Sequence, residues 1–386
     1  MTNRVSRRRF MTGTGAAVGG LVIAPGILAA CGGSDSSSGG SSAADVYFDN
    51  WTLYIDKPGD KLYGKGGTLD EFQKSSGKKI KYVEGYNDNN EYFAKVQPLL
   101  SAGKPIAPNL IAPTFWMAGR YITLGWAEKL PLSKVPNAKN LLTTLQKPPS
   151  DPTGEYTLPW QSGMAGIAYN QKVTGRPITK VDDLWDPAFK GKIGMLTEMR
   201  DTIGLIAMAQ GIDLDKPTYD KFVPAFDKLQ EEVDKGQIRA FTGNDYVEGL
   251  EQGNFAACVG WSGDVVQLSK SNPDIKFVIP ESGGTLWFDT MLVPKGAQNT
   301  DSVAEWMNYV YDPVNAARIT ATVQYISPVQ GVQDELKKMG GEAAALADSQ
   351  LLFPDATTLA NLQSWGNLDE AEEQKFDERF AEISGA

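Results

Sequence analysis

The chain has 386 residues, 41% hydrophobic and 22% charged, which is a globular composition with length enough for about two domains. It has no histidine, which excludes histidine-based triads, histidine general bases and histidine metal ligands, and its formal net charge is −10. Its two cysteines, Cys31 and Cys258, form no closely spaced cluster, so no zinc-site spacing exists.

Residues 1–30 have the features of an export signal. Ser6-Arg7-Arg8-Arg9-Phe10-Met11 resembles a twin-arginine signature. The weakly hydrophobic stretch that follows is interrupted by Pro25 and is not hydrophobic enough for a convincing membrane span. It ends in Leu28-Ala29-Ala30-Cys31, which resembles a bacterial lipobox. We therefore expect Cys31 to be lipid-modified and to become the mature N-terminus. The alternative is an unrelated cysteine at the end of an ordinary signal.

Residues 31–44 are expected to form a flexible tether, because 32–42 are almost all Gly and Ser. A lipid anchor and a tether would hold the folded body on the outer face of a membrane. The signal contains four arginines and no acidic residue, so its removal lowers the net charge from −10 to −14. An acidic body is a poor nucleic-acid binder and would tolerate cationic ligands. The same charge also fits a merely soluble surface.

Strands and helices are expected to alternate through the first part of the body. We expect strands at 45–50, 79–83 and 108–112, with helices at 68–77, 89–102 and from 115. Thr68-Leu69-Asp70-Glu71 has a capping-box pattern, and Pro98 is expected to bend the second helix. This alternation is typical of α/β architecture with mainly parallel sheets.

The remaining chain continues this pattern, without an evident internal repeat. Further strands are expected at 164–169, 192–196, 255–261 and 275–279, with Cys258 as a core residue of the third. Helices are expected at 200–210, 216–235, 300–311, 313–322, 333–339 and 369–382.

The segment Gly283–Pro294 is expected to run as an extended strand from one lobe of the protein to the other. Trp287 and Asp289 stand two residues apart, so on a strand their side chains project to the same side. An aromatic face beside a carboxylate can receive an organic cation. The alternative is a core tryptophan beside a solvated aspartate.

Five segments resemble the bacterial spermidine/putrescine-binding proteins, which are receptors of polyamine ABC importers. The segments are Phe48–Ile55, Asp183–Lys192, Val259–Gly263, Gly284–Asp289 and Gln324–Pro328. The similarity runs from about residue 45 to the C-terminus. It implies a type II periplasmic-binding-protein fold, in which two α/β lobes flank a ligand cleft and are joined by crossing hinge strands. We place lobe 1 at 45–160 plus 289–338 and lobe 2 at 161–288 plus 339–386.

The resemblance also implies a set of ligand-binding residues: Trp51, Tyr54, Glu198, Asp201, Trp261, Trp287, Asp289 and Tyr325, with Phe115 and Trp160 as further candidates. Glu198 and Asp201 could instead be a helix-capping pair. The chain departs from the family pattern at Pro113 and Phe115, which removes two hydroxyls, and at Gly366, which removes a side-chain amide.

A polyamine presents methylenes that favour flat apolar walls and ammonium groups that favour carboxylates or π faces. We therefore expect a monomeric, membrane-anchored receptor that passes a polyamine to permease subunits of an ABC importer. No catalytic residue, cofactor or metal is expected. The alternatives are a receptor for another cation or a sugar, or a secreted enzyme resembling a two-carboxylate glycosidase.

Overall fold

The computed structural model describes residues 44–56 and 66–385. The expected export signal, Cys31 and residues 31–43 of the tether lie outside the described residues. The helices, strands and cores below all belong to the body of the chain, residues 43–386.

The strands of the described body alternate with helices through most of the chain, in agreement with the α/β prediction. They are β1 (Val46–Trp51), β2 (Ile80–Tyr86), β3 (Leu110–Ile111), β4 (Thr157–Asn170), β5 (Ile193–Leu196), β6 (Ile238–Thr242), β7 (Ala257–Trp261), β8 (Ile275–Val278), β9 (Gly284–Leu292) and β10 (Leu362–Gln363).

The α-helices include those predicted, with ends shifted by a few residues, and several that were not predicted, the longest of them at Ser262–Ser271. They are α1 (Thr68–Ser76), α2 (Asn89–Ser101), α3 (Phe115–Thr123), α4 (Gln171–Thr174), α5 (Met199–Ala209), α6 (Tyr219–Asp234), α7 (Tyr246–Glu251), α8 (Ser262–Ser271), α9 (Thr300–Val310), α10 (Pro313–Val323), α11 (Val332–Met339), α12 (Gly341–Leu346), α13 (Ala356–Ala360) and α14 (Glu370–Ser384).

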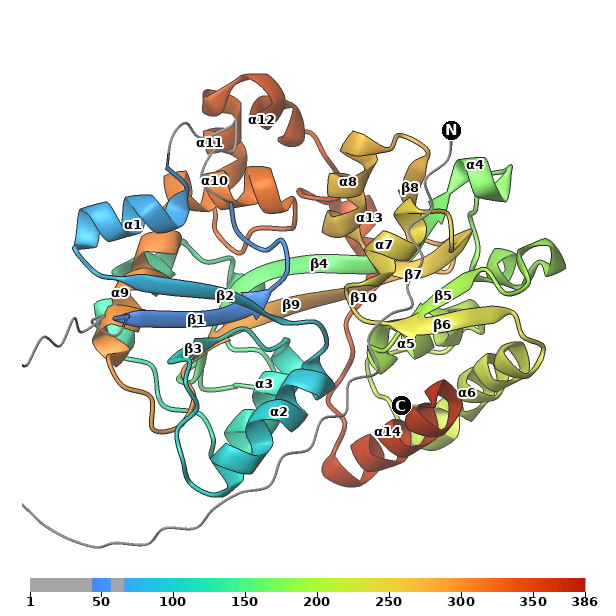
Figure 1. The fold of residues 1–386 in the computed structure, drawn as a ribbon, viewed down its shortest axis with the longest axis horizontal. Coiled ribbons are helices and arrows are strands. Elements are labelled where there is room, and N and C mark those ends of the chain that lie inside the picture. The colour runs from blue at the N-terminus through green and yellow to red at the C-terminus, as the bar shows by residue number, and fades with distance from the viewer. Residues whose placement is uncertain (1–43, 57–65, 386) are drawn as a thin grey trace, which may run out of the picture. The chain divides into compact units, whose positions relative to one another are not determined.

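Two long strands at the centre of the sheet connect its two sides (Figure 1). The strand order in the described residues is β2-β1-β3-β9-β4-β7-β5-β6. The outer groups are parallel, β1 with β2 and β3 on one side and β5 with β6 and β7 on the other. β4 and β9 pair with each other antiparallel, and β4 is also antiparallel to β7 and β8. The expectation of mainly parallel pairing therefore holds for the outer groups and fails at the crossing.

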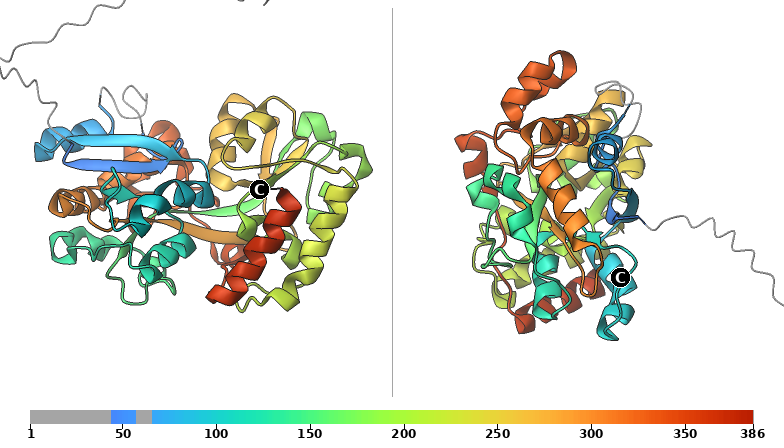
Figure 2. Two further views of the ribbon diagram at one scale, coloured as in Figure 1. Left: turned by 60° about the horizontal axis from the view of Figure 1, so that its bottom comes forward. Right: turned by 90° about the vertical axis from the view of Figure 1, so that its left-hand side faces the viewer.

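The buried side chains form two hydrophobic cores, one in each lobe, and the left-hand view of Figure 2 shows the helices gathered in two groups around them. β4 takes part in both cores: Trp160 near its start packs in the first, and Ile167 and Ala168 near its end pack in the second. This is the arrangement of a strand that crosses between lobes. Ala343 and Ala347 pack in the first core, so the return to the second lobe comes later than the expected boundary at residue 339.

The expected capping box at the start of α1 is wrong. Gly67 occupies the N-cap position, and no side chain caps the helix there. The backbone N–H of Thr68 instead donates to Asp56 Oδ2 at 2.7 Å, so a carboxylate from the loop after β1 satisfies it. A distant acceptor therefore replaces the local one that the sequence pattern indicated.

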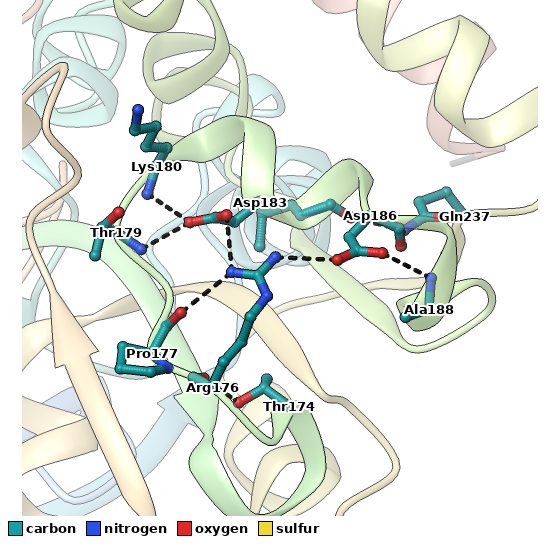
Figure 3. Close-up of polar contacts among 10 residues, drawn as sticks. Thr174, Arg176, Pro177, Thr179, Lys180, Asp183, Asp186, Ala188 and Gln237 are labelled. Atoms are coloured by element: carbon teal, nitrogen blue, oxygen red, sulfur yellow. Dashed lines mark hydrogen bonds and ion pairs between the residues drawn. The ribbon is translucent and has the colours of Figure 1, made fainter.

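The segment 183–192, one of those that carry the family resemblance, has a structural role (Figure 3). Arg176 forms ion pairs with Asp183 at 2.8 Å and Asp186 at 3.1 Å. Gln237 donates to the carbonyl oxygens of Leu184 and Asp186, at 2.7 and 2.9 Å. These contacts fix two short 3₁₀ turns, Val181–Trp185 and Pro187–Phe189, in the lobe that contains the second core.

Candidate functional site

A cavity lies where residues of the two cores meet. Its lining is formed by Trp51, Thr52, Tyr54, Asn89, Thr114, Phe115, Trp116, Glu198, Arg200, Asp201, Asn244, Trp261, Asp264, Thr285, Leu286, Trp287, Asp289, Tyr325 and Trp365. The cavity thus brings together all eight main candidates from the sequence, and Phe115.

Five aromatic side chains form a continuous series of edge-on contacts along the cavity. The ring centroids of Trp51 and Trp261 are 6.3 Å apart, and those of Trp261 and Trp287 are 6.4 Å apart. Tyr325 follows at 5.3 Å from Trp287, and Tyr54 at 5.3 Å from Tyr325. Such a wall offers flat apolar surface to methylene groups, and its ring faces attract cations.

Asp289 reaches the cavity from the crossing strand β9, on which Trp287 precedes it by two residues. Its carboxylate accepts hydrogen bonds from Tyr54 at 2.8 Å and Thr114 at 2.6 Å. Burial raises the pKa of Asp289 to about 7, although both hydrogen bonds act to lower it. The same-side placement expected for Trp287 and Asp289 is found, and Asp289 is buried rather than solvated.

Glu198 and Asp201 enter the cavity from the start of α5, and only Glu198 caps the helix. Glu198 is the N-cap residue and accepts from the backbone N–H of Arg200 at 3.3 Å. Asp201 accepts from the indole of Trp261 at 2.7 Å and from Thr285 at 2.5 Å. Burial raises the pKa of Asp201 to about 6, and burial followed by the charge of Asp201 raises the pKa of Glu198 well above its usual value.

A fourth carboxyl, Asp264, lines the cavity and was not anticipated from the sequence. It accepts from Tyr325 at 2.8 Å, Tyr246 at 3.0 Å and Asn244 at 2.9 Å. Burial raises the pKa of Asp264 to about 6, because its effect is larger than the lowering effect of these hydrogen bonds. A usable signal was its position three residues after Trp261, in the first turn of a helix that directly follows a buried strand.

The sequence singled out Trp160, Phe115 and Gly366, and the structure shows where each of them lies. Trp160 does not line the cavity, because it packs in the first core 5.4 Å from Phe48 and 6.4 Å from Trp306. Phe115 does line it and stacks on Phe288 at 4.8 Å. At Gly366, a Cβ atom would lie 1.8 Å from the carbonyl oxygen of Asp215, so no side chain fits there.

Other lining residues were missed because nothing in their local sequence marks them. Thr114 supports Asp289 directly, and Asn89 supports it through Thr114, to which it donates at 2.8 Å. The indole of Trp365 donates to the carbonyl oxygen of Arg200 at 2.8 Å. These contacts join segments that are distant in sequence, so only the folded chain reveals them.

Two α/β lobes joined by crossing strands, with a cavity between them, are the architecture of an extracytoplasmic solute receptor. The chain belongs to the family of bacterial extracellular solute-binding proteins, whose sequence profile matches residues 68–348.

Similar proteins and structures agree with this family. The chain is 25% identical over 323 residues to the spermidine/putrescine-binding periplasmic protein of Escherichia coli K12, covering 83% of this chain and 86% of that protein. It is 29% identical over 317 residues to the putrescine-binding periplasmic protein SpuD of Pseudomonas aeruginosa, covering 75% and 80%. The TpPotD lipoprotein of Treponema pallidum has the same fold, with a TM-score of 0.71 at 19% identity, covering 88% of this chain and 99% of that one.

The described residues contain neither a helix fit to span a membrane nor a cluster of metal ligands. Across 44–56 and 66–385, no helix combines the length and the apolar character needed to cross a membrane. Over the same residues, no group of three or more acidic or cysteine side chains could hold a metal ion.

Proposed function

We propose that this protein is an extracytoplasmic receptor that captures a polyamine in its cavity and delivers it to the permease of an ABC importer. The observation that carries the proposal is that one cavity holds four carboxyl groups, three of them buried and that of Glu198 half-buried, together with the wall of five aromatic rings. We propose Trp51, Tyr54, Glu198, Asp201, Trp261, Asp264, Trp287, Asp289 and Tyr325 as the ligand-contacting residues.

The chemistry of the lining favours an organic cation over a neutral ligand. Burial raises the pKa of all four carboxyls, because each loses the solvation of its charged form. A bound ammonium group supplies the positive charge that stabilises the ionised form, and a sugar hydroxyl cannot. The aromatic rings suit the methylenes between the ammonium groups.

The ligands bound by the relatives support the same ligand class. The E. coli protein is a spermidine/putrescine-binding protein and the P. aeruginosa protein is a putrescine-binding protein. A further relative from P. aeruginosa, 25% identical over 358 residues, is a putrescine/cadaverine-binding protein. We propose that this protein likewise binds its ligand without chemical change and acts as a monomer.

Calorimetric titration with putrescine, cadaverine, spermidine and spermine tests this proposal, with a thermal-unfolding panel beside it. At least one amine should bind and raise the unfolding temperature, because ligand binding to the folded state stabilises it. Oligosaccharides and glucose serve as the contrasting ligands and should leave the unfolding temperature unchanged. Stabilisation by a glycan alone would favour the sugar-receptor or glycosidase-like alternatives.

We also propose that Cys31 is lipidated and anchors the protein to the outer face of the cell membrane, after export through a twin-arginine signal. Replacing Cys31 with Ala should release the protein into the soluble extracytoplasmic fraction, since the folded body does not contain this residue. Its thermal unfolding should match that of wild type extracted in detergent. Retention of the variant in the membrane fraction would contradict the lipoprotein assignment.

A further inference from the structure

Arg200 carries the positive charge found among the described residues that line the cavity. Its side chain is only 7% exposed and is held from two sides. The guanidinium lies 4.0 Å from the ring centroid of Trp116, which belongs to α3 in the other lobe. On the α14 side it forms an ion pair with Glu373 at 3.0 Å.

The position of Arg200 couples it to two of the four cavity carboxyls. Glu198 and Asp201 flank it at the start of α5, and the charge of Arg200 lowers the pKa of both carboxyls against the larger effect of burial. An ammonium group bound at this pair would therefore have a guanidinium close by. Glu373 is absent from the cavity lining, so its charge is further from a ligand than that of Arg200.

We propose that Arg200 is a resident cation of the cavity, which makes the site selective for diamines over amines with three or four ammonium groups. This inference rests on the proposed function and specifies its substrate class. It assigns to Arg200 a role in specificity that the aromatic and acidic residues do not have.

The selectivity follows from how charges are distributed around the cavity. The cavity carboxyls can receive two ammonium groups, one of them against Asp201 and Glu198 at the start of α5. A further ammonium would share the remaining space with the guanidinium of Arg200. It could not use the face of Trp116 on which the guanidinium already lies. Repulsion between like charges is strong in a buried site because neither water nor salt screens it well. Such repulsive contacts are a common means of rejecting a near relative of the correct ligand.

Two substitutions should shift the selectivity in opposite directions. Arg200→Met removes the charge but keeps a long apolar side chain, and should raise the spermidine-to-putrescine affinity ratio by at least about tenfold, as expected for loss of one like-charge contact. Glu373→Gln leaves Arg200 without its partner and should lower the same ratio by about threefold or more. Arg200→Lys keeps the charge and should retain the diamine preference. The measurement is calorimetric titration of each variant with both amines.

The chain offers a matched pair of control variants on the same helix as Glu373. Arg379 and Glu382 form an ion pair at 3.2 Å on α14, and neither lines the cavity. Arg379→Met and Glu382→Gln change the net charge as the two test variants do, so they should leave the affinity ratio unchanged. Thermal unfolding of every variant separates misfolding from altered selectivity. If Arg200→Met does not fold, Glu373→Gln still tests the proposal.

Wild type should bind putrescine or cadaverine more tightly than spermidine. A wild-type preference for spermidine would overturn the role of Arg200 and leave the proposed polyamine receptor standing. Unchanged affinity ratios in the folded variants at positions 200 and 373 would do the same. Absence of binding to every amine would overturn both proposals.

Discussion

At the scale of single residues, Asp289 gives the sharpest test of the proposed site. Asp289→Asn keeps size and hydrogen-bonding capacity but removes the charge that a buried ammonium needs. We expect polyamine affinity to fall at least about 30-fold, corresponding to about 2 kcal/mol. The unliganded protein should be as stable as wild type or slightly more stable, because burial disfavours the charged carboxyl.

The exposed Asp182 provides the control for Asp289. Asp182→Asn makes the same change of charge at a residue that does not line the cavity, and it should bind with wild-type affinity. Calorimetric titration of the two variants beside wild type is decisive. Equal affinities for all three proteins would remove Asp289 from the site, together with the main physical case for a polyamine.

The pH dependence of binding follows from the same group of carboxyls. The pKa values of Asp201 and Asp264 are raised to about 6 and that of Asp289 to about 7. Because these pKa values exceed those of the unfolded chain, the carboxyls reduce the stability of the unliganded protein as pH rises from about 4 to 7. Ligand affinity should change in the opposite sense, since the ionised carboxyls bind ammonium groups that stay protonated.

We therefore expect affinity at pH 8 to exceed that at pH 5 by at least about tenfold, the equivalent of one unit of pKa. Titration near pH 6 in two buffers of different ionisation enthalpy should reveal proton release on binding. Asp289→Asn should release fewer protons than wild type. Equal affinity at both pH values, without proton release, would mean that the carboxyls are ionised before the ligand arrives.

Residue types with distinctive chemistry could be selected from the sequence, and their supporting partners could not. Trp287 and Asp289 were predicted from their spacing alone, and the remaining aromatic and acidic candidates followed from the family resemblance. Asp264 escaped because the helix that begins at Ser262 was not predicted, so the sequence-based prediction did not place this carboxyl at the start of a helix. Trp160 was wrongly included because a tryptophan on a crossing strand can face either the cavity or the core, and the sequence does not say which.

At the scale of elements, the pairing of β4 with β9 shapes the aromatic wall. Gly163 on β4 lies opposite Trp287 on β9. A Cβ atom at Gly163 would lie 2.6 Å from a ring carbon of Trp287 and 2.7 Å from one of Tyr325. The absence of a side chain there lets both rings lie against the strand.

Gly163→Ala should therefore displace the two rings and weaken polyamine binding by at least about tenfold, with a loss of stability of about 1–3 kcal/mol from overpacking. Gly194→Ala is the matched control, because its Cβ would lie 2.9 Å from that of Cys258 in the second core, outside the cavity lining. It should lose stability and keep its affinity. A similar loss of affinity in both variants would show that general destabilisation explains the effect.

Hydrophobic periodicity and turn residues identified most of the longer elements to within a few residues. The misses have local causes. β6 and α7 are short, and β10 comprises only Leu362 and Gln363, so neither composition nor periodicity could mark them. The capping box predicted at Thr68 is wrong because a carboxylate from another segment, that of Asp56, accepts the hydrogen bond from the backbone N–H of Thr68.

At the scale of the whole body, lobe membership depends on contacts that are distant in sequence. The resemblance predicted two lobes and two crossings, and β4 and β9 match those crossings. The expected return at residue 339 came too early, since Ala343 in α12 and Ala347 just after it pack in the first core, and alanines do not indicate which core will bury them. The other lobe boundaries stay predictions.

The lobes meet beside the cavity through polar contacts that suit a closing motion. Thr197 Oγ1 donates to Asp88 Oδ2 at 2.7 Å, and Asn244 N donates to the carbonyl oxygen of Asn87 at 3.3 Å. Neither Thr197 nor Asp88 lines the cavity, so their contact bears on closure rather than directly on the ligand. Ligand-binding residues on both lobes should draw the lobes together through hinge movement at the crossing strands.

We expect small-angle scattering of the soluble Cys31→Ala protein to show a smaller radius of gyration when polyamine is added. Thr197→Val removes the hydroxyl that bridges the lobes while keeping side-chain shape. It should weaken binding about fivefold, near the value of one hydrogen bond, through faster dissociation. Thr174→Val is its control, since the Thr174 hydroxyl donates to the Arg176 carbonyl oxygen within one lobe (Figure 3). An unchanged radius at saturating ligand, with wild-type dissociation in Thr197→Val, would mean that the two lobes form a rigid site and that ligand enters without hinge opening.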